Sequence, residues 1–280
     1  MRHAAQPTAL ITGASDGIGY ETARRLASVG WNVLLHAPTH ERRADALRRL
    51  VDDNVPSERL RVVAADFARL SEVRDMAETL AASHSKLDVL VNNAAIAGPP
   101  SRTVTVDGNE LTFQINYLAA YLLTRRLTAQ LNASGWGRVI NVSSTLHRTA
   151  NLDWADPQRV RTYRPVAAYA QSKLALTMFS RELAHDESDQ LVMIRVHPGI
   201  VETPLRRIYS PSTPGASVSE GGIMLAHLAS PQIEVTAGGY YERLTPAKPA
   251  ALADKPAAVR RLARLSDRLT GLVSPTAKAS

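Results

Sequence analysis

Short apolar runs alternate with longer segments of helical periodicity along most of this chain, and this alternation restricts the fold more than any other feature. Six runs have the length and composition of strands, and a seventh, weaker run lies near residues 239–242. Strands that alternate with crossover helices form a parallel, doubly wound sheet with helices on both faces. The sequence therefore predicts an α/β fold with about seven strands. The six clear runs are residues 9–12, 32–36, 60–65, 88–92, 138–142 and 191–196.

The segments between these runs predict helices. One helix is expected from about residue 18 to Gly30, because glycine is favoured just beyond a helix end. Long helices are expected at 107–131 and 166–185, and an amphipathic helix at 257–272. Two further helices are predicted by apolar stripes at helical spacing. The stripes are Ala44, Leu47, Leu50 and Val51 in one helix, and Val73, Met76, Ala77 and Leu80 in the other.

No repeat, low-complexity tract or linker interrupts this pattern, so we expect residues 1–280 to form a single domain. In a doubly wound sheet, ligands bind at the carboxyl ends of the strands, near the point where the strand order reverses. Two long segments, 145–165 and 203–220, lack a clear pattern. Segments of this length are either substrate-binding loops or disordered, and both interpretations stay open.

The composition excludes several classes of protein. The 280 residues include no cysteine, so disulfides and thiolate metal sites are excluded, and no metal site is predicted. No run approaches the roughly 18 apolar residues that span a bilayer, and the polar start of the chain lacks the features of a signal peptide. We therefore expect a cytoplasmic protein without a membrane span. The net charge is +7, but the arginines are dispersed, which favours a solvated surface over nucleic-acid binding.

Glycines cluster directly after the first predicted strand, where the first predicted helix begins. Gly13, Gly17 and Gly19 form a G-x-x-x-G-x-G pattern. Glycine permits positive φ angles and close approach of the backbone to a ligand, and the free N–H groups of a helix N-terminus attract a pyrophosphate. Turns also use glycines for structural reasons alone. The position at the first strand–helix junction nevertheless favours a dinucleotide phosphate site.

Tyr169 and Lys173 are four residues apart in a predicted helix and therefore share one face. A nearby ammonium favours the phenolate, so we expect Lys173 to lower the pKa of the tyrosine toward neutrality. Such a tyrosine can act as a general acid or base. Ser143 and Ser144 follow the fifth run, where a serine hydroxyl either binds a reacting oxygen or caps a turn. Each of these signals is weak when taken alone.

Further motifs follow in the same order as in a known family. Asp66 comes after the third run, the sequence Asn92-Asn93-Ala94-Ala95 after the fourth, and residues 198–203 after the sixth. Together with the glycines and Tyr169, they resemble the short-chain dehydrogenase/reductase family over residues 8–272. The resemblance implies a Rossmann-type fold and hydride transfer between NAD(P)(H) and an alcohol or carbonyl compound. It implies the catalytic residues Asn116, Ser144, Tyr169 and Lys173. The implied cofactor contacts are Gly13, Ser15, Asp16, Gly17, Ile18, Gly19, Asp66, Phe67, Asn93, Ala94, Tyr169, Lys173, Pro198, Gly199, Val201 and Thr203.

The resemblance also implies a role for each catalytic residue. Tyr169 gives or takes the proton, and Ser144 shares the substrate oxygen with it. Lys173 adjusts the pKa of Tyr169 and holds the nicotinamide ribose, while Asn116 anchors a water that leads protons from the lysine to solvent. His147 and the sequence around His197 are similar to the retinol-dehydrogenase-like branch of the family.

The second predicted strand bears on the choice of cofactor. Pro38 stands where that branch often has an arginine for the 2′-phosphate of NADP. However, residues 36–39 contain no carboxylate for the ribose diol of NAD. His36, His40, Arg42 and Arg43 are candidates to bind a phosphate instead. A charge-matched contact favours NADP(H) over NAD(H).

The substrate and the assembly are less determined. Aromatic and aliphatic residues in the segment 145–165 suit a fairly apolar small molecule, although Trp154 has the alternative of packing the loop itself. The competing function is a non-catalytic dinucleotide sensor, but such a protein is expected to lose Tyr169 or Lys173. A related epimerase or dehydratase would need a sizeable second domain, and only about 80 residues follow the sixth run. The resemblance is compatible with a homodimer or homotetramer paired through the helices at 107–131 and 166–185, unless the C-terminal helix alters that pairing.

Overall fold

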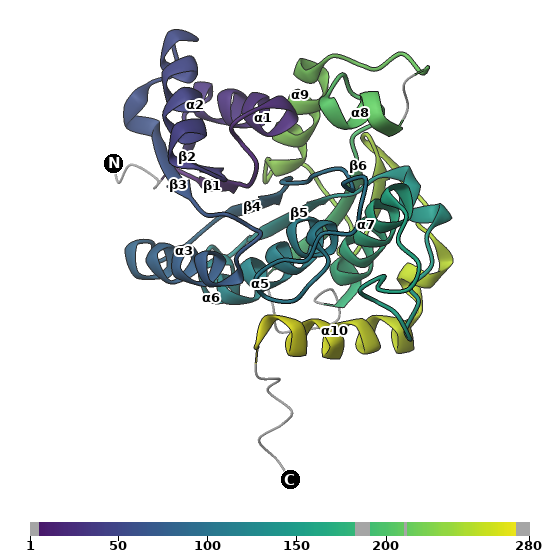
Figure 1. Ribbon diagram of the computed structural model, residues 1–280. Coiled ribbons are helices and arrows are strands. Elements are labelled where there is room, and N and C mark those ends of the chain that lie inside the picture. The colour runs from purple at the N-terminus through teal and green to yellow at the C-terminus, as the bar shows by residue number, and fades with distance from the viewer. Residues whose placement is uncertain (1–5, 183–190, 210–211, 273–280) are drawn as a thin grey trace.

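The computed structural model describes residues 6–182, 191–209 and 212–272, and it is built on an eight-stranded sheet (Figure 1). The strand order is β3-β2-β1-β4-β5-β6-β7-β8, so the order reverses between β1 and β4. All pairs from β3 to β7 are parallel, and only β8 is antiparallel to its neighbour. The predicted doubly wound α/β fold is confirmed. The strands are β1 (Thr8–Ile11), β2 (Asn32–Ala37), β3 (Leu60–Ala64), β4 (Val89–Asn92), β5 (Arg138–Val142), β6 (Val192–His197), β7 (Tyr240–Glu242) and β8 (Thr245–Ala247).

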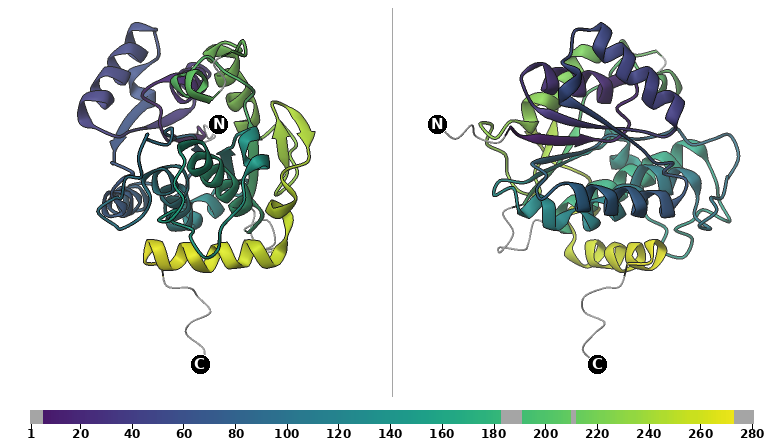
Figure 2. Two further views of the ribbon diagram at one scale, coloured as in Figure 1. Left: turned by 45° about the vertical axis from the view of Figure 1, so that its right-hand side comes forward. Right: turned by 90° about the vertical axis from the view of Figure 1, so that its left-hand side faces the viewer.

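Helices cover both faces of the sheet, as Figures 1 and 2 show. The sequences of the central strands are continuous apolar runs, because both faces of these strands are buried. Along β1, Leu10 contributes to one core and Ile11 to the other. One face is covered by α1 (Gly17–Ser28), α2 (His40–Asp52) and α9 (Val218–Ala229), and the other by α3 (Leu70–Ser83), α5 (Ala119–Arg126) and α7 (Pro165–Glu182).

The last helix, α10 (Pro256–Thr270), lies across the outer side of the layer that contains α5 and α7 (Figure 2). Its buried stripe includes Val259 and Leu262, which join the core beneath α7. The hydroxyl of Tyr121 on α5 donates to the Asp267 carboxylate at 2.7 Å, which ties α10 to α5. Helix α10 therefore covers a face that α5 and α7 would otherwise present to solvent.

The predicted single helix at 107–131 is wrong. Helical structure begins with α4 (Leu111–Phe113), continues through a π-helical turn η2 (Gln114–Leu118) into α5, and is interrupted at Leu127 before α6 (Thr128–Asn132). The start is late because the Glu110 carboxylate accepts from the N–H groups of Thr112 and Phe113, which makes it the N-cap.

Two apolar stripes have different outcomes. The α3 stripe is confirmed, because all four of its predicted residues are buried. In α2, by contrast, Leu50 is buried and the partly buried Leu47 packs against the core, while Ala44 and Val51 are exposed. The α2 stripe is therefore confirmed for Leu47 and Leu50 and wrong for Ala44 and Val51. For α7, the predicted start at 166 is one residue late, and the predicted end at 185 lies outside the described residues.

The two segments without a clear pattern contain short helices. The 3-10 helix η3 (Thr145–Thr149) follows β5, and α8 (Pro204–Tyr209) follows β6. A capping box between Ser217 and Glu220 then begins α9. The sequence pattern does not predict β8, a three-residue edge strand whose central Pro246 cannot donate a backbone hydrogen bond. None of the helices in the described part of the chain is both long and apolar enough to span a membrane.

Candidate active site

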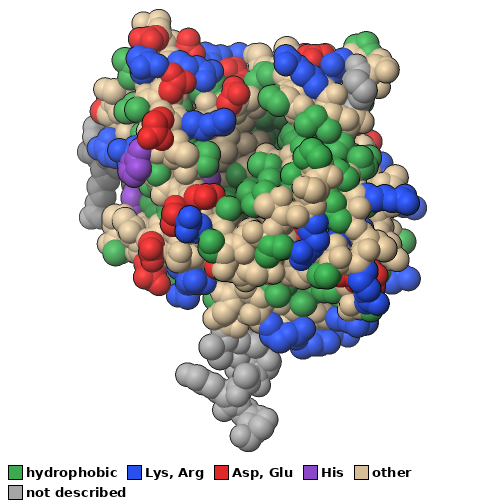
Figure 3. Space-filling model, viewed as in Figure 1, with side chains coloured by type: hydrophobic (Ala, Val, Ile, Leu, Met, Phe, Trp, Pro, Cys, Tyr) green, Lys and Arg blue, Asp and Glu red, His purple; other side chains and the backbone are tan. Residues whose placement is uncertain are grey.

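A cavity of about 620 Å³ opens at the carboxyl ends of the strands, beside the point where the strand order reverses (Figure 3). Its walls come from the β1–α1 loop, the ends of β2 to β6, the first half of α7, and α8. This is the place where doubly wound sheets bind ligands. The volume lies in the range of small-molecule and cofactor sites.

The glycine loop forms one wall of the cavity. Gly13 and Gly17 have φ angles of +65° and +57°, a backbone conformation that favours glycine. The carboxylate of Asp16 accepts from the Gly17 N–H at 2.7 Å and caps α1 at its first turn. Ser15 and Ile18 complete this wall, so the N-terminus of α1 faces the cavity.

Gly19 does not line the cavity, although it was predicted as a cofactor contact. A Cβ at this position would overlap the carbonyl oxygen of Gly13 and the side-chain amide of Asn93. Gly19 therefore lets α1 pack directly on the loop. Asn93 fixes the same loop from the other side, because its Nδ2 donates to the carbonyl of Thr12 at 2.9 Å.

The structure changes the role expected of His36. This residue is buried at the end of β2, where its Nδ1 accepts from the Gly13 N–H at 3.1 Å and its Nε2 donates to the Ala65 carbonyl at 2.9 Å. Burial lowers the pKa of His36 to about 4. A neutral histidine with both nitrogens engaged cannot bind a phosphate as a cation, so that expectation is wrong for His36. Its imidazole instead holds the glycine loop against β2.

Of the other three cationic candidates, Arg42 is the one that lines the cavity, next to Pro38. His40 and Arg43 are not among the described residues of its wall. The remaining predicted contacts do lie on the wall. They are Asp66, Phe67 and Ala94 at the ends of β3 and β4, with Asn93, and Pro198, Gly199, Val201 and Thr203 after β6.

Ser144, Tyr169 and Lys173 meet in the same cavity. Ser144 follows β5, and the other two lie one turn apart on α7. The Lys173 ammonium donates to the Val142 carbonyl at 2.8 Å and lies 5.8 Å from the centre of the Tyr169 ring. Burial lowers the pKa of Lys173 to about 7.

The pKa of Tyr169 moves in the opposite direction to the one expected from its neighbour Lys173. Burial is the largest cause and raises this pKa, the hydroxyl of Tyr209 raises it further, and the Ser144 side chain opposes the shift. In this structure, removal of water around the phenol outweighs any effect of the lysine. Tyr169 is therefore held in its protonated form.

Asn116 lies in the π-helical turn η2 and does not line the cavity. Its Oδ1 accepts from the Ile96 N–H at 2.8 Å, and its Nδ2 donates to the Ile96 carbonyl at 3.0 Å and to Ser172 at 3.1 Å. The side chain thus fixes the backbone after β4 beside α7. Its predicted part in a proton relay stays a prediction.

A sequence model described as short chain dehydrogenase matches residues 7–212 of this chain. The chain belongs to the short-chain dehydrogenase family. Retinol dehydrogenase 13 of Mus musculus is 34% identical over 286 residues, which cover 95% of this chain and 84% of that protein. Polyprenol dehydrogenase of Mus musculus is 34% identical over 280 residues, or 94% of this chain and 83% of that protein.

A solved structure shares the fold. A blue fluorescent protein from a metagenomic library, crystallised in complex with NADPH, is 28% identical and has a TM-score of 0.67, with 84% of this chain and 95% of that chain covered. The predicted similarity to the retinol-dehydrogenase-like branch of the short-chain dehydrogenases is confirmed by the curated relatives.

One residue of this short-chain dehydrogenase was not anticipated from its sequence. Tyr209, at the end of α8, stacks on the ring of Tyr169 with centroids 4.3 Å apart and an angle of 29° between the planes. Its hydroxyl accepts from the Gly98 N–H at 2.8 Å, which closes α8 over the cavity. Nothing in the spacing of the sequence relates these two tyrosines, because the contact depends on how α8 folds back on α7.

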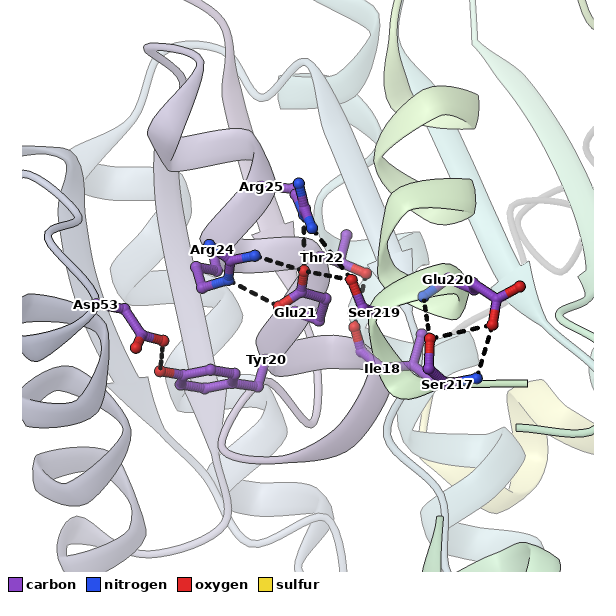
Figure 4. A network of polar contacts seen from close by, with 10 residues as sticks. All are labelled: Ile18, Tyr20, Glu21, Thr22, Arg24, Arg25, Asp53, Ser217, Ser219 and Glu220. Atoms are coloured by element: carbon purple, nitrogen blue, oxygen red, sulfur yellow. Dashed lines mark hydrogen bonds and ion pairs between the residues drawn. The ribbon is translucent and has the colours of Figure 1, made fainter. Parts of the chain in front are cut away.

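Helix α9 packs against α1 (Figure 4). Glu21 on α1 forms ion pairs of 2.7 Å with Arg24 and Arg25, and Arg25 also donates to Ser219 on α9 at 3.1 Å. A Cβ at Gly222 of α9 would overlap the Glu21 side chain, so the two helices pack closely. Helix α1, whose N-terminus faces the cavity, is therefore joined closely to α9.

Replacing Tyr209 with alanine tests the effect of the stack on Tyr169. Loss of the ring admits water to the phenol, so the desolvation that raises the pKa of Tyr169 should weaken, and this pKa should fall. If Tyr169 is the base in alcohol oxidation, the rising limb of kcat/KM against pH should move to lower pH. Tyr209→Phe is the comparison, because it keeps the stacked ring and removes only the hydroxyl, which binds Gly98 and makes the smaller contribution to the raised pKa of Tyr169, so its profile should move less than that of Tyr209→Ala. An unchanged profile in Tyr209→Ala would contradict the assigned role of the stack.

Proposed function

We propose that this short-chain dehydrogenase is an NAD(P)(H)-dependent oxidoreductase that interconverts an alcohol with a ketone or aldehyde on a fairly apolar small molecule. One observation carries the proposal. Ser144, Tyr169 and Lys173 line the same cavity as the glycine loop at the start of α1. The side chains suited to proton transfer and the loop suited to a dinucleotide therefore line the same cavity.

The residues present fit a dinucleotide. At Gly17, an added Cβ would meet only the Thr203 side chain, at 3.8 Å, so the N-terminus of α1 is open to the cavity. The backbone N–H groups and the helix dipole suit a pyrophosphate there. When bound, the nicotinamide would accept or supply the hydride. Lys173, held by Val142 beneath Tyr169, is placed to bind a ribose hydroxyl.

Tyr169 and Ser144 provide the acid–base chemistry of the proposal. In carbonyl reduction, the protonated phenol of Tyr169 donates its proton to the substrate oxygen, and in alcohol oxidation it takes that proton back. Ser144 binds the same oxygen and so holds the reacting carbon in place. The stacked Tyr209 excludes water from this position, which keeps Tyr169 protonated until a substrate enters.

The apolar part of the wall supports an apolar substrate. Ile96, Leu146, Ile200, Leu205 and Ile208 line the cavity, mostly on the side of α8. Such walls bind a ligand by burial of its hydrocarbon surface. The relatives' names point the same way, because retinol and polyprenols are alcohols with long hydrocarbon portions. A screen of apolar alcohols, ketones and aldehydes with NADPH and NADH tests the proposal, and turnover of none of them would favour the sensor alternative.

We propose NADP(H) as the preferred cofactor, with Arg42 as the residue that recognises the 2′-phosphate. Arg42 lines the cavity beside Pro38, and no carboxylate lies at the end of β2 to take the ribose diol of NAD. A guanidinium forms strong charge-assisted bonds with phosphate. The NADPH-bound relative supports this choice.

The cytoplasmic location stays a prediction, which cell fractionation would test.

Arg42→Ala should raise the KM for NADPH by about tenfold or more and leave the KM for NADH almost unchanged. The cause is loss of the charged partner of the 2′-phosphate, which NADH lacks. Arg43→Ala is the matched control, because Arg43 lies on the same helix and is not a described residue of the cavity wall. Equal effects on both cofactors would contradict the role given to Arg42, and steady-state kinetics with each cofactor measures the difference.

A further inference from the structure

His147 lies directly behind Ser144 and is not among the described residues of the cavity wall. It belongs to η3 and is fully buried. Its side-chain Nδ1 lies 2.6 Å from the Ser144 carbonyl oxygen, and its backbone N–H donates to the same oxygen at 3.0 Å. A carbonyl oxygen has two lone pairs, so His147 alone fills the acceptor capacity of the Ser144 carbonyl.

The second ring nitrogen determines the tautomer of His147. Its Nε2 accepts from the Ala250 N–H at 3.0 Å, because a backbone amide nitrogen can only donate. A neutral imidazole has one donor nitrogen and one acceptor nitrogen, so Nδ1 carries the proton and donates to the Ser144 carbonyl. Burial lowers the pKa of His147, which keeps the ring neutral. Both ring nitrogens are therefore engaged in hydrogen bonds of fixed direction.

Neighbouring groups hold this imidazole and the short helix that carries it. The ring of Tyr240 packs against the imidazole, with centroids 5.0 Å apart and an angle of 56° between the planes. The next residue of η3, Arg148, forms an ion pair of 2.5 Å with Glu242 at the end of β7. Among the described residues of the cavity wall, none comes from segment 240–250. This segment therefore supports η3 from outside the cavity.

The Ser144 carbonyl lies at the junction between the sheet and η3. Ser144 is the N-cap of η3 and has an extended backbone with a ψ angle of 149°. If its carbonyl lost the bond from Nδ1, the turn after β5 would be freer to rotate, and the serine hydroxyl would shift relative to Tyr169. Ser143 offers no replacement, because its hydroxyl is bonded to that of Thr177 at 2.6 Å.

We propose that His147 is a positioning residue, which fixes the Ser144 carbonyl through Nδ1–H and so aims the serine hydroxyl at the substrate oxygen. The bond from Ala250 keeps the proton of the imidazole on the nitrogen that faces Ser144. This inference rests on the proposed function, in which Ser144 binds the reacting oxygen. A misplacement of about 1 Å in such a group costs on the order of a hundredfold in rate.

Two amide substitutions separate the two side-chain bonds of His147. The Nδ2 of asparagine is as many bonds from Cα as the Nδ1 of histidine, so His147→Asn keeps the donor to Ser144 and loses the acceptor for Ala250. The Oε1 of glutamine corresponds in the same way to Nε2. His147→Gln therefore keeps the acceptor for Ala250 and loses the donor to Ser144.

His147→Gln should lower kcat by about thirtyfold or more, whereas His147→Asn should stay within a few-fold of the unchanged protein. The KM for NADPH should change little in either variant, because neither side-chain bond of His147 involves the glycine loop. Steady-state kinetics with the full chain measures both quantities. Equal losses of kcat in the two variants, or a larger loss in His147→Asn, would overturn the proposal.

Combination with Ser144→Ala tests whether His147 acts through the serine. If it does, His147→Gln should cost almost nothing more in a protein that already lacks the Ser144 hydroxyl, because residues that act together are not additive. If the histidine only stabilises the fold, the two losses of kcat should multiply. Multiplied losses would therefore contradict a positioning role.

Thr149→Val is the matched control for a general weakening of η3. Thr149 is exposed at the end of this helix, and its hydroxyl donates to the Leu146 carbonyl at 2.9 Å. The substitution removes one hydrogen bond from η3 without touching the Ser144 carbonyl, so kcat should change by no more than a few-fold. A loss as large as that in His147→Gln would show that the bond to Ser144 has no special effect.

NMR measurements separate this proposal from the proposed function. The ring nitrogen spectrum of the unchanged protein should show His147 as the Nδ1–H tautomer at neutral pH, and the Nε2–H tautomer would overturn the proposal. The Ala250 N–H should exchange faster with solvent in His147→Asn than in His147→Gln, because only glutamine retains an acceptor for it. If the unchanged protein turns over no alcohol or carbonyl compound, the proposed function fails, while the tautomer and the exchange rates still decide whether His147 joins Ser144 to Ala250.

Discussion

Tyr169→Phe should lower kcat by about a thousandfold, because the substitution removes the hydroxyl that we propose gives and takes the proton and preserves the ring that packs against Tyr209. Binding of NADPH should change little, since the phenol oxygen is a small part of the cofactor site. Steady-state assays measure kcat, and a fluorescence titration measures the affinity for NADPH. We expect a large loss of kcat with almost unchanged affinity.

A suitable control is Tyr163→Phe, which removes the hydroxyl of a tyrosine that donates to the Pro99 carbonyl and is not a described residue of the cavity wall. It should retain kcat within a few-fold. Comparable losses in both variants would indicate a general effect of loop packing. Full activity in Tyr169→Phe would remove the acid–base assignment altogether.

Gly19→Ala should destabilise the protein and abolish tight dinucleotide binding. The new Cβ would overlap the Gly13 carbonyl and the Asn93 amide, so either α1 or the glycine loop must move. Overpacking of this kind costs about 1–3 kcal/mol, and the displaced N–H groups no longer face the cavity together. Denaturant unfolding gives the free energy, and isothermal titration with NADPH gives the affinity.

Ser28→Ala, near the exposed end of the same helix, provides the reference for this prediction. It should leave both quantities close to those of the unchanged protein. If Gly19→Ala bound NADPH normally, the close packing of α1 on the loop would not be needed for the site. Loss of affinity with normal stability would show that the loop moves and the fold does not.

Much of the site was predictable because two simple rules locate it. Parallel strands bring their carboxyl ends to one edge, so the glycine loop after β1 and Ser144 after β5 had to lie on the same side of the sheet. Tyr169 and Lys173, four residues apart on α7, had to share one face. The cavity contains all of these residues.

The wrong predictions concern residues whose pKa depends on how deeply the folded protein buries them. His36 is a plausible phosphate ligand by position, but the structure buries it and lowers its pKa to about 4. The pKa of Tyr169 rises for the same reason, although the spacing to Lys173 suggested the reverse. The stack of Tyr209 on Tyr169 could not be predicted from the sequence, because residues 203–220 have no periodicity that fixes where α8 lies. Sequence patterns locate such groups but do not reveal how much water remains around them.

The position of α10 has a consequence for how the protein behaves in dilute solution. The resemblance to the family suggested pairing through the helices around α5 and α7, yet α10 already occupies that face through Val259, Leu262 and the bond between Tyr121 and Asp267. A partner could bind there only after α10 had left, which would expose its apolar stripe. Helix α10 thus covers this face within the same chain. We therefore expect a melting temperature that does not change with protein concentration, whereas the melting temperature of an obligate dimer rises with concentration.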